Sequence, residues 1–248
     1  MSRAILYDST LCIGCKSCEA ACAQRWHLPY DDKVAAETKI SAHKLTTIQT
    51  FGDHYSRRLC MHCAEPTCAS VCPVGALHKT AFGPVLYDAE KCMGCRYCMT
   101  ACPFQVPAYE WNSQLPKVRK CDMCYDRQRA GQLTACAENC PTGATACGER
   151  DALVAEARRR LAAKPNEYYQ RIYGLQEVGG TSVLYLSAVP FEQIGLRTDL
   201  PQQPLPHLTW RVLEALPNVV SVGSVLLGGI WWITNRRDEV ARAEGGKR

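Results

Sequence analysis

Apolar and β-branched residues gather in short segments along this chain, a pattern that predicts short strands joined by loops. Two such segments are KLTTIQTF at residues 44–51 and GPVLYD at residues 83–88, and the stretches around them carry glycine and proline. A third segment, GGTSVLYLSAVPFEQIGL at residues 179–196, starts with two glycines and is also rich in strand-forming residues. We therefore expect short elements and much irregular loop.

One segment between these strands predicts an amphipathic helix. In DALVAEARRRLAAKP, residues 151–165, Leu153 and Leu161 belong to a narrow apolar stripe at helical spacing. Asp151 is placed to cap this helix, and the proline at the end of the segment to stop it. The three consecutive arginines at residues 158–160 are expected on a solvated helix face, not in a nucleic-acid site.

The most apolar segment lies near the C-terminus. Residues 215–235, ALPNVVSVGSVLLGGIWWITN, are 21 uncharged residues, which as a helix span about 31 Å, the thickness of a bilayer core. Trp231 suits a membrane interface, and the arginine pair 236–237 favours a cytoplasmic C-terminus. Pro217 falls near the first turn of this span, where proline is tolerated. A buried core helix is the alternative, although such helices are usually shorter.

Cysteine is the residue type that indicates the chemistry. The chain has 17 cysteines in 248 residues, and all but Cys147 fall into four groups that begin with C-x₂-C. The groups are Cys12, Cys15, Cys18 and Cys22; Cys60, Cys63, Cys68 and Cys72; Cys92, Cys95, Cys98 and Cys102; and Cys121, Cys124, Cys136 and Cys140. A disulfide framework would spread its cysteines apart. Structural zinc would join two pairs across a longer spacer.

The third group has the spacing of a bacterial ferredoxin. CMGCRYCMTACP, residues 92–103, follows C-x₂-C-x₂-C-x₃-C-P, in which three thiolates hold one [4Fe–4S] cluster and the fourth binds its neighbour. Gly14 and Gly94 precede the second cysteine of their groups, where a loop around a cluster uses positive φ. His62 and Met123 occupy this position in the other two groups, so we expect those loops to turn differently.

Other residues near the cysteines allow two interpretations. His62 is either a hydrogen-bond donor toward a cluster or, as we expect, a loop residue facing solvent. Lys117, Arg119 and Lys120 either raise a nearby cluster potential or line a solvated strand edge. Cys147 is expected to be an inert buried thiol.

The charge of the chain argues against nucleic-acid binding once clusters are counted. The formal charge is +5 and the pI about 8.4, but four clusters of about −2 each, thiolates included, would make the protein slightly acidic. The sequence contains no haem motif C-x-x-C-H, no P-loop and no dinucleotide fingerprint. Electron transfer is therefore the expected chemistry.

The order of the four spacings resembles the four-cluster iron–sulfur subunit of the molybdopterin oxidoreductases, over roughly residues 4–148. That family includes subunits of formate dehydrogenase, dimethyl sulfoxide reductase, polysulfide reductase and some nickel–iron hydrogenases. The resemblance implies an α+β fold with two ferredoxin-like modules, one inserted in the other. Residues 1–55 and 104–148 would form the first module, 56–103 the inserted module, 149–207 a covering segment that includes the strand of residues 179–196, and 208–248 the transmembrane helix and a cytoplasmic tail.

The resemblance also implies how sixteen cysteines would hold four [4Fe–4S] clusters. The expected ligand sets are Cys12, Cys15, Cys18 and Cys140 (set A); Cys121, Cys124, Cys136 and Cys22 (set B); Cys60, Cys63, Cys68 and Cys102 (set C); and Cys92, Cys95, Cys98 and Cys72 (set D). In each set the fourth cysteine comes from a different group, as in ferredoxins.

The function implied is a non-catalytic subunit that relays single electrons. Its expected partners are a catalytic subunit, of formate dehydrogenase or a similar molybdopterin enzyme, and a membrane cytochrome b or quinone site. A nickel–iron hydrogenase subunit is the alternative within the family, and a zinc-binding membrane interaction protein the alternative outside it. We expect one span through residues 215–235 of a bacterial inner membrane, with the clusters in the periplasm. No signal peptide opens the sequence, and the family resemblance implies export together with a signal-bearing catalytic partner.

Overall fold

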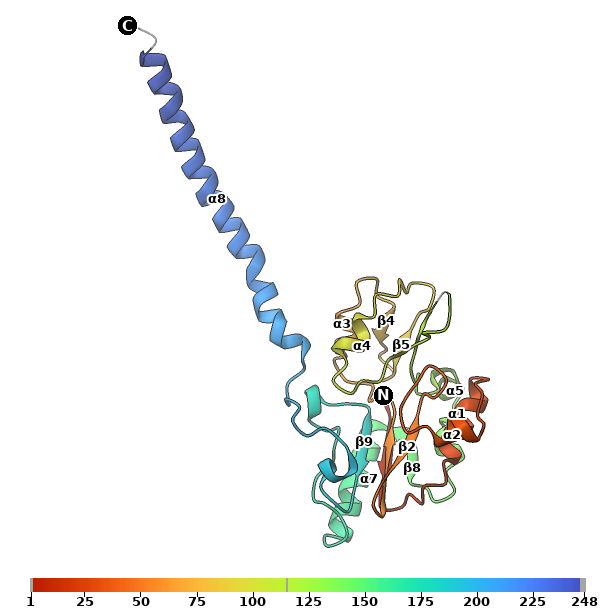
Figure 1. The fold of residues 1–248 in the computed structure, drawn as a ribbon. Coiled ribbons are helices and arrows are strands. Elements are labelled where there is room, and N and C mark those ends of the chain that lie inside the picture. Colours follow the sequence, from red (N-terminus) through yellow and green to blue (C-terminus); the bar gives the residue numbers. More distant parts are fainter. Residues whose placement is uncertain (1, 115, 246–248) are drawn as a thin grey trace. The chain divides into compact units, whose positions relative to one another are not determined.

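The computed structural model describes residues 2–114 and 116–245, which divide into two compact units at Pro206 (Figure 1). The strands are β1 (Arg3–Asp8), β2 (Thr47–Phe51), β3 (His54–Arg58), β4 (Leu77–Lys79), β5 (Val85–Tyr87), β6 (Ala108–Tyr109), β7 (Val118–Arg119), β8 (Thr145–Glu149) and β9 (Val183–Leu186). The helices are α1 (Ser17–Arg25), α2 (Asp32–Ala36), α3 (Thr67–Ser70), α4 (Tyr97–Ala101), α5 (Tyr125–Arg129), α6 (Ala135–Glu138), α7 (Arg150–Ala163) and α8 (Pro206–Gly245), with 3-10 turns η1 (Glu177–Gly179) and η2 (Phe191–Ile194). This mixture agrees with the expected α+β class.

Strand β1 is the middle strand of a three-stranded sheet with the order β8-β1-β9. It runs antiparallel to β8, with Ile5 opposite Cys147, and parallel to β9, with Ile5 opposite Val183. Successive side chains of a strand point to opposite faces of the sheet. Because β1 is buried from its second residue to its last, both faces of the sheet are covered.

Helix α7 covers one face of this sheet. The buried residues on that side come from both elements: Ala4, Leu6, Leu184 and Leu186 from the strands, and Leu153, Val154, Ala157 and Leu161 from the helix. The predicted apolar stripe of α7 is thus confirmed. Its burial explains why a helix with such a polar sequence is stable, since packing contributes more to helix stability than propensity does.

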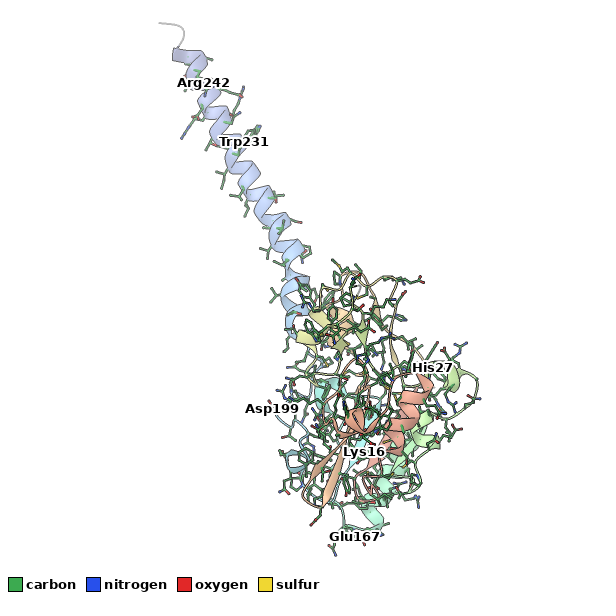
Figure 2. All side chains as sticks on the ribbon, turned by 45° about the vertical axis from the view of Figure 1, so that its right-hand side comes forward. Lys16, His27, Glu167, Asp199, Trp231 and Arg242 are labelled. Carbon is green, nitrogen blue, oxygen red and sulfur yellow. The ribbon has the colours of Figure 1, made fainter. Side chains whose placement is uncertain are left out.

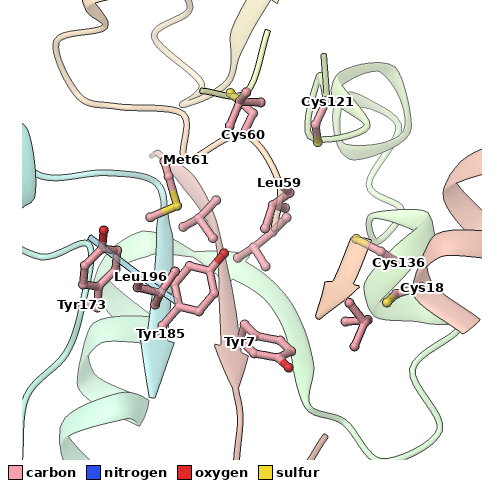
Figure 3. Close-up of a cluster of buried hydrophobic side chains, with 14 of the residues drawn as sticks. Tyr7, Cys18, Leu59, Cys60, Met61, Cys121, Cys136, Tyr173, Tyr185 and Leu196 are labelled. Carbon is pink, nitrogen blue, oxygen red and sulfur yellow. The ribbon is translucent and has the colours of Figure 1, made fainter. Parts of the chain in front are cut away.

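The opposite face of the sheet packs against cysteines. Alternate residues of the strands, including Tyr7 and Tyr185, share an apolar cluster with Cys18, Cys60 and Cys136 (Figure 3). The segment 179–196 therefore supplies strand β9 beside the cysteines, as predicted. The sheet therefore separates helix α7, on one face, from the cysteine thiols, on the other.

The remaining strands form hairpins. β2 pairs with β3, β4 with β5, and β6 with β7, each pair antiparallel. The two strands predicted at residues 44–51 and 83–88 are confirmed as β2 and β5. These short hairpins hold the loops that carry the cysteine groups.

Helix α7 begins one residue before Asp151, the capping residue predicted for it. Glu149 is the N-cap and its side chain makes no capping hydrogen bond, whereas Asp151 lies inside the first turn. The predicted cap was wrong because β8 leads directly into the helix and leaves no loop for Asp151. An acidic residue in the first turn still interacts favourably with the helix dipole.

The arginines of α7 do not all face solvent. Arg158 and Arg159 are exposed as expected, but Arg160 is partly buried. Its Nη1 lies 3.0 Å from Oδ2 of Asp8, whose side chain is fully buried, and its Nε lies 2.8 Å from Glu156. Asp8 also accepts hydrogen bonds from Thr10 and from the hydroxyl of Tyr168. Arg160 thus ties α7 to the end of β1, and the prediction for it was wrong.

Helix α8 forms the second unit and contains the predicted span of residues 215–235. Its apolar window has a mean hydropathy of 1.5 and none of it is buried. Figure 2 shows side chains, including Trp231, projecting all around this helix. Pro217 lies in the interior of α8 and not near its first turn, because the helix starts at Pro206. An interior proline leaves one carbonyl without its helical partner, which membrane helices tolerate.

The contact between Arg160 and Asp8 can be tested by mutation. We expect Arg160→Ala to destabilise the first unit by about 2 kcal/mol, because a buried carboxylate loses its cation. The apparent unfolding midpoint of the holoprotein would fall by about 4–8 °C at one heating rate. The control is Arg159→Ala, since Arg159 also pairs with Glu156 but is 75% exposed. Equal effects of the two replacements would contradict this role of Arg160.

Candidate iron–sulfur site

All sixteen grouped cysteines lie in the first unit, and none of the 17 cysteines forms a disulfide. Their burial differs by group. Cys15 is exposed, while Cys121, Cys124 and Cys136 are buried. A disulfide framework is therefore not what holds this fold together.

One pocket gathers the four thiols of set A. Its lining includes Cys12, Cys15 and Cys18 from the first group and Cys140 from the fourth group. Ile48 of β2 and Thr145 of β8 are among the other residues that line this pocket. The pocket thus brings together cysteines of the first and the last group along the chain.

A second pocket gathers the four thiols of set D. Its lining includes Cys92, Cys95 and Cys98 from the third group and Cys72 from the second group. Leu77, Val85 and Val118 form the apolar core around these thiols. Again one thiol comes from a different group than the other three.

In sets B and C, too, thiols from different cysteine groups lie near one another, as their effects on each other's pKa indicate. Burial raises the pKa of Cys63, and the neighbouring Cys60, Cys102 and Cys68 thiolates raise it further. Burial likewise raises the pKa of Cys22, a thiol of the first group, and the fourth-group thiolates of Cys136 and Cys124 raise it too. Burial raises the pKa of Cys121, and Cys22 adds to this. Thiols that influence one another in this way are close neighbours.

Backbone amides among the described residues donate hydrogen bonds to cysteine sulfurs. Examples are the N–H groups of Ala76 to Cys72 (3.2 Å), Met123 to Cys121 (3.2 Å), Ala135 to Cys124 (3.5 Å) and Thr145 to Cys140 (3.4 Å). For Cys140, burial raises the pKa, but the hydrogen bonds from Thr145 and Thr142 outweigh it, so the pKa lies below its ordinary value. Such bonds stabilise the thiolate form that iron binds.

One feature of the backbone turn recurs in all four groups. The residue before the second cysteine has positive φ in each: Gly14 (70°), His62 (48°), Gly94 (75°) and Met123 (57°). The second and fourth loops therefore resemble the other two at this position, so the expectation that they turn differently was wrong here. It is confirmed after the second cysteine, where Lys16 and Arg96 have positive φ in the first and third groups, whereas the fourth group has it at Cys124 itself and the second group at neither position. Left-handed φ costs a non-glycine residue about 1–2 kcal/mol, and burial of both side chains offsets this cost, since His62 and Met123 are 0% exposed.

His62 is buried and not solvent-facing, which corrects the prediction. Its Nδ1 accepts a hydrogen bond from the Val85 N–H at 3.0 Å, so Nε2 carries the proton. Burial, followed by the charges of Lys120 and Lys79, holds its pKa well below the ordinary value and keeps the ring neutral. Nε2 is buried without a hydrogen-bond partner in the described part of the chain. This leaves a donor between two cysteines, Cys60 and Cys63, for an acceptor such as a cluster sulfur.

Of the three basic residues before the fourth group, Lys117 is exposed, and the other two have different environments. Arg119 forms an ion pair with Glu110 at 2.6 Å and is 42% exposed. Lys120 is buried and donates to the carbonyls of Val85 and Cys121, the latter at 2.9 Å. Its charge lowers the pKa of Cys68, although burial dominates and raises that pKa to about 12. Arg119 is thus a surface residue, whereas Lys120 lies near the thiols.

Cys147 lies on β8 and is half-buried. Its thiol donates to Oε1 of Gln128 at 3.2 Å, and burial raises its pKa above the ordinary value. A raised pKa leaves little of the reactive thiolate at neutral pH. These observations agree with the expected inert thiol.

The donor sets fit [4Fe–4S] clusters. Within residues 2–114 and 116–245, no three His, Cys, Asp or Glu side chains converge closely enough to hold a single metal ion. Zinc would draw its thiolates to about 2.3 Å from one atom, whereas a cluster spreads four thiolates over four irons. A bound cluster takes up and releases one electron at a time. The chain supplies the thiolates, their amide hydrogen bonds and the apolar surroundings that exclude water.

Comparison with known proteins agrees with this chemistry. Residues 53–150 match one family of 4Fe-4S dicluster domains, and residues 11–76 match another. A protein of Nitratidesulfovibrio vulgaris is 40% identical over 98% of this chain and 70% of its own length. The hydrogenase-2 operon protein HybA of Escherichia coli O157:H7 is 38% identical over 79% and 73%. The formate dehydrogenase-O iron-sulfur subunit of Escherichia coli K12 is 34% identical over 94% and 85%.

These relatives are matched over most of both chains, and the matched region includes every cysteine group described above. The chain therefore belongs to the family of 4Fe-4S dicluster iron–sulfur proteins, as an electron-transfer subunit of the formate dehydrogenase and hydrogenase type.

Proposed function

We propose that this chain holds four [4Fe–4S] clusters in sets A to D and relays single electrons through them between a catalytic subunit and a membrane partner. The observation that carries the proposal is the composition of two pockets. Each is lined by three cysteines of one group and the last cysteine of another. This is the exchange of fourth ligands found in two-cluster ferredoxins.

The proposed sets define two modules, with one inserted in the other. Sets C and D use only cysteines between Cys60 and Cys102, and sets A and B use the cysteines on either side of that range. The apolar core around set D also includes Cys68 of set C, which supports one inner module. The outer module would then be complete only with the fourth cysteine group, which follows the inner module in the sequence and shares sets A and B with the first group.

The neighbours of the buried thiols support a linear order of clusters, A-B-C-D. Burial raises the pKa of Cys18 in set A to about 11, with a further rise from Cys136 in set B. Burial raises the pKa of Cys121 in set B, with a smaller rise from Cys60 in set C. Burial raises the pKa of Cys68 in set C to about 12, with a smaller rise from Cys98 in set D. Electrons would then pass from set to set without a branch.

The two ends of this order are the parts open to partners. The residue after the first cysteine is exposed in set A (Ile13, 60%) and in set D (Met93, 66%), but buried in set C (Met61, 3%). Exposed apolar side chains beside a cluster suit a protein interface. We infer that one end meets the catalytic subunit and the other a cytochrome b or quinone site.

A formate dehydrogenase catalytic subunit is the first candidate for the partner, since a formate dehydrogenase iron-sulfur subunit aligns over 94% of this chain. A hydrogenase is the second candidate, favoured by the higher identity, 38%, to the hydrogenase-2 operon protein HybA. Purification of the tagged complex in mild detergent, followed by assay for formate or hydrogen oxidation, would decide between them.

Helix α8 is proposed to anchor this chain in a bacterial inner membrane through residues 215–235. Its 40 residues extend about 60 Å, enough to cross a bilayer and continue beyond it. The arginine pair 236–237 after the apolar segment supports a cytoplasmic C-terminus, and thus periplasmic clusters.

The first prediction from the proposed function concerns the metal content of the protein. We expect about 16 irons per chain and an equal amount of acid-labile sulfide, since every proposed ligand is a cysteine. Elemental analysis of the purified protein measures this directly. Four or fewer metal ions per chain, all of them zinc, would contradict the proposal and favour a zinc-binding protein.

The second prediction concerns the exchanged ligands. Cys102→Ser is expected to alter the EPR signal of the cluster held by Cys60, Cys63 and Cys68, while the matched variant Cys72→Ser alters the one held by Cys92, Cys95 and Cys98. Replacements within each trio, such as Cys63→Ser and Cys95→Ser, assign the two signals. The opposite outcome, with each group holding its own cluster, would refute the ligand sets.

The third prediction concerns the anchor. Truncation after Leu205 should release a protein that needs no detergent and keeps about 16 irons, because every proposed ligand precedes Pro141. The truncation keeps Pro201 and Gln202, whose carbonyls accept hydrogen bonds from Val178 and Gly179. It should still be reduced by dithionite but lose quinone reduction in membranes. Loss of iron or aggregation of the truncated chain would instead identify α8 as a core helix.

A further inference from the structure

Arg57 is a buried cation with no carboxylate partner in the part of the chain that the structure describes. Its side chain, on β3, is among the largest fully buried ones and the residue is only 1% exposed. Its guanidinium donates hydrogen bonds to two threonine hydroxyls, and no described carboxylate forms an ion pair with it. An unpaired buried charge costs several kcal/mol, so its compensation must come from elsewhere.

Another buried cation of the same unit is paired with a carboxylate, which is the usual arrangement for a buried charge. Lys44 is 3% exposed, and its Nζ lies 2.8 Å from a carboxylate oxygen of Glu19, whose side chain is fully buried. Lys44 also donates to the carbonyls of Val34 and Glu37. The contrast shows that the fold can pair a buried cation with a carboxylate, yet gives Arg57 none.

The hydrogen bonds of Arg57 fix its guanidinium beside set A. Nε donates to Thr46 at 3.0 Å, and Nη1 donates to the hydroxyl of Thr145 at 3.2 Å. Thr145 lines the pocket of set A, and its backbone N–H donates to Cys140. Only one threonine therefore separates the guanidinium from a proposed ligand of the first cluster.

On its other side, the guanidinium faces set B. The thiolate of Cys136, a proposed ligand of that set, is the charge that raises the pKa of Arg57 most. Burial lowers the pKa of Arg57, but the thiolates of Cys136 and Cys18 outweigh it, so the cation is retained. In turn its charge lowers the pKa of Cys18 in set A and of Cys22 in set B, although burial dominates for both.

We propose that Arg57 is the counter-ion shared by the clusters of sets A and B, and that it raises the reduction potential of both. This inference rests on the proposed sets A and B. Each cluster with its thiolates is an anion that gains a further negative charge on reduction. A fixed cation in a low-dielectric interior stabilises the reduced form more than the oxidised form. Sets C and D, which lie beyond Arg57 in the proposed order, would feel it much less.

The test is a redox titration of the full-length protein in detergent, followed by EPR. We expect Arg57→Gln to lower the equilibrium constant for reduction about tenfold for two clusters, a shift of about 59 mV for one electron each. Cys15→Ser and Cys124→Ser assign the signals of sets A and B. Arg57→Lys keeps the charge without the planar fork, and its shift should be clearly smaller.

Arg58→Gln is the matched control. Arg58 is the next residue of β3, and its Nη1 donates to the carbonyl of Gly195 at 2.8 Å in an exposed contact. We expect all four potentials to stay unchanged in this variant. Equal shifts of all four clusters in Arg57→Gln, or no shift in any, would overturn the counter-ion role.

Iron content keeps the test decisive if Arg57→Gln assembles poorly. Retention of about eight irons of 16, with the signals of sets C and D intact and full iron in Arg57→Lys, would support the proposal. Equal iron loss in Arg57→Gln and Arg57→Lys would overturn it, because the positive charge that Arg57→Lys keeps would then not be what the two clusters require. Fewer than four clusters in the wild-type protein would instead refute the proposed function, which separates the two failures.

Discussion

Holding negative charge inside a small apolar core is the constraint on which this structure depends. Thiols that ligate iron must be ionised, yet burial raises the pKa of several of the proposed ligands, including Cys18, Cys63 and Cys121. The chain compensates with backbone N–H groups aimed at sulfur and with cations such as Arg57 and Lys120. The sheet β8-β1-β9 makes this possible, because it keeps the helix α7 and its surface charges on the face away from the thiols.

The chemistry could be predicted from the sequence because cysteine spacing is local. Two-residue gaps and positive φ at Gly14 and Gly94 are properties of short loops, and the structure has them. The same φ at His62 and Met123 could not be predicted, since residue type gives no reason for it. It depends on burial against segments distant in sequence, such as β5, whose Val85 N–H donates to His62.

Long-range packing also explains the other differences from prediction. A run of three arginines suggests a uniform solvated face, but Arg160 alone reaches Asp8, which lies at the end of the first strand. The capping role of Asp151 failed because β8 and α7 are continuous. Helix α8 extends beyond its apolar segment on both sides, so Pro217 lies deeper in the helix than the hydrophobic pattern alone indicated. No sequence pattern singled out Arg57, because an arginine in a strand is ordinarily a surface residue.

The mixed lining of the set A pocket has a consequence for biosynthesis. Cys12, Cys15 and Cys18 leave the ribosome early, but the thiol that closes their pocket, Cys140, is translated only after both inner groups. The set D pocket needs nothing beyond Cys98. Iron–sulfur loading during translation would therefore proceed from the middle of the nascent chain outward, with the N-terminal thiols waiting in reduced form for the last group. With the proposed ligand sets, a ribosome stalled before Cys140 would carry a chain in which sets C and D have all their cysteines and set A still lacks one.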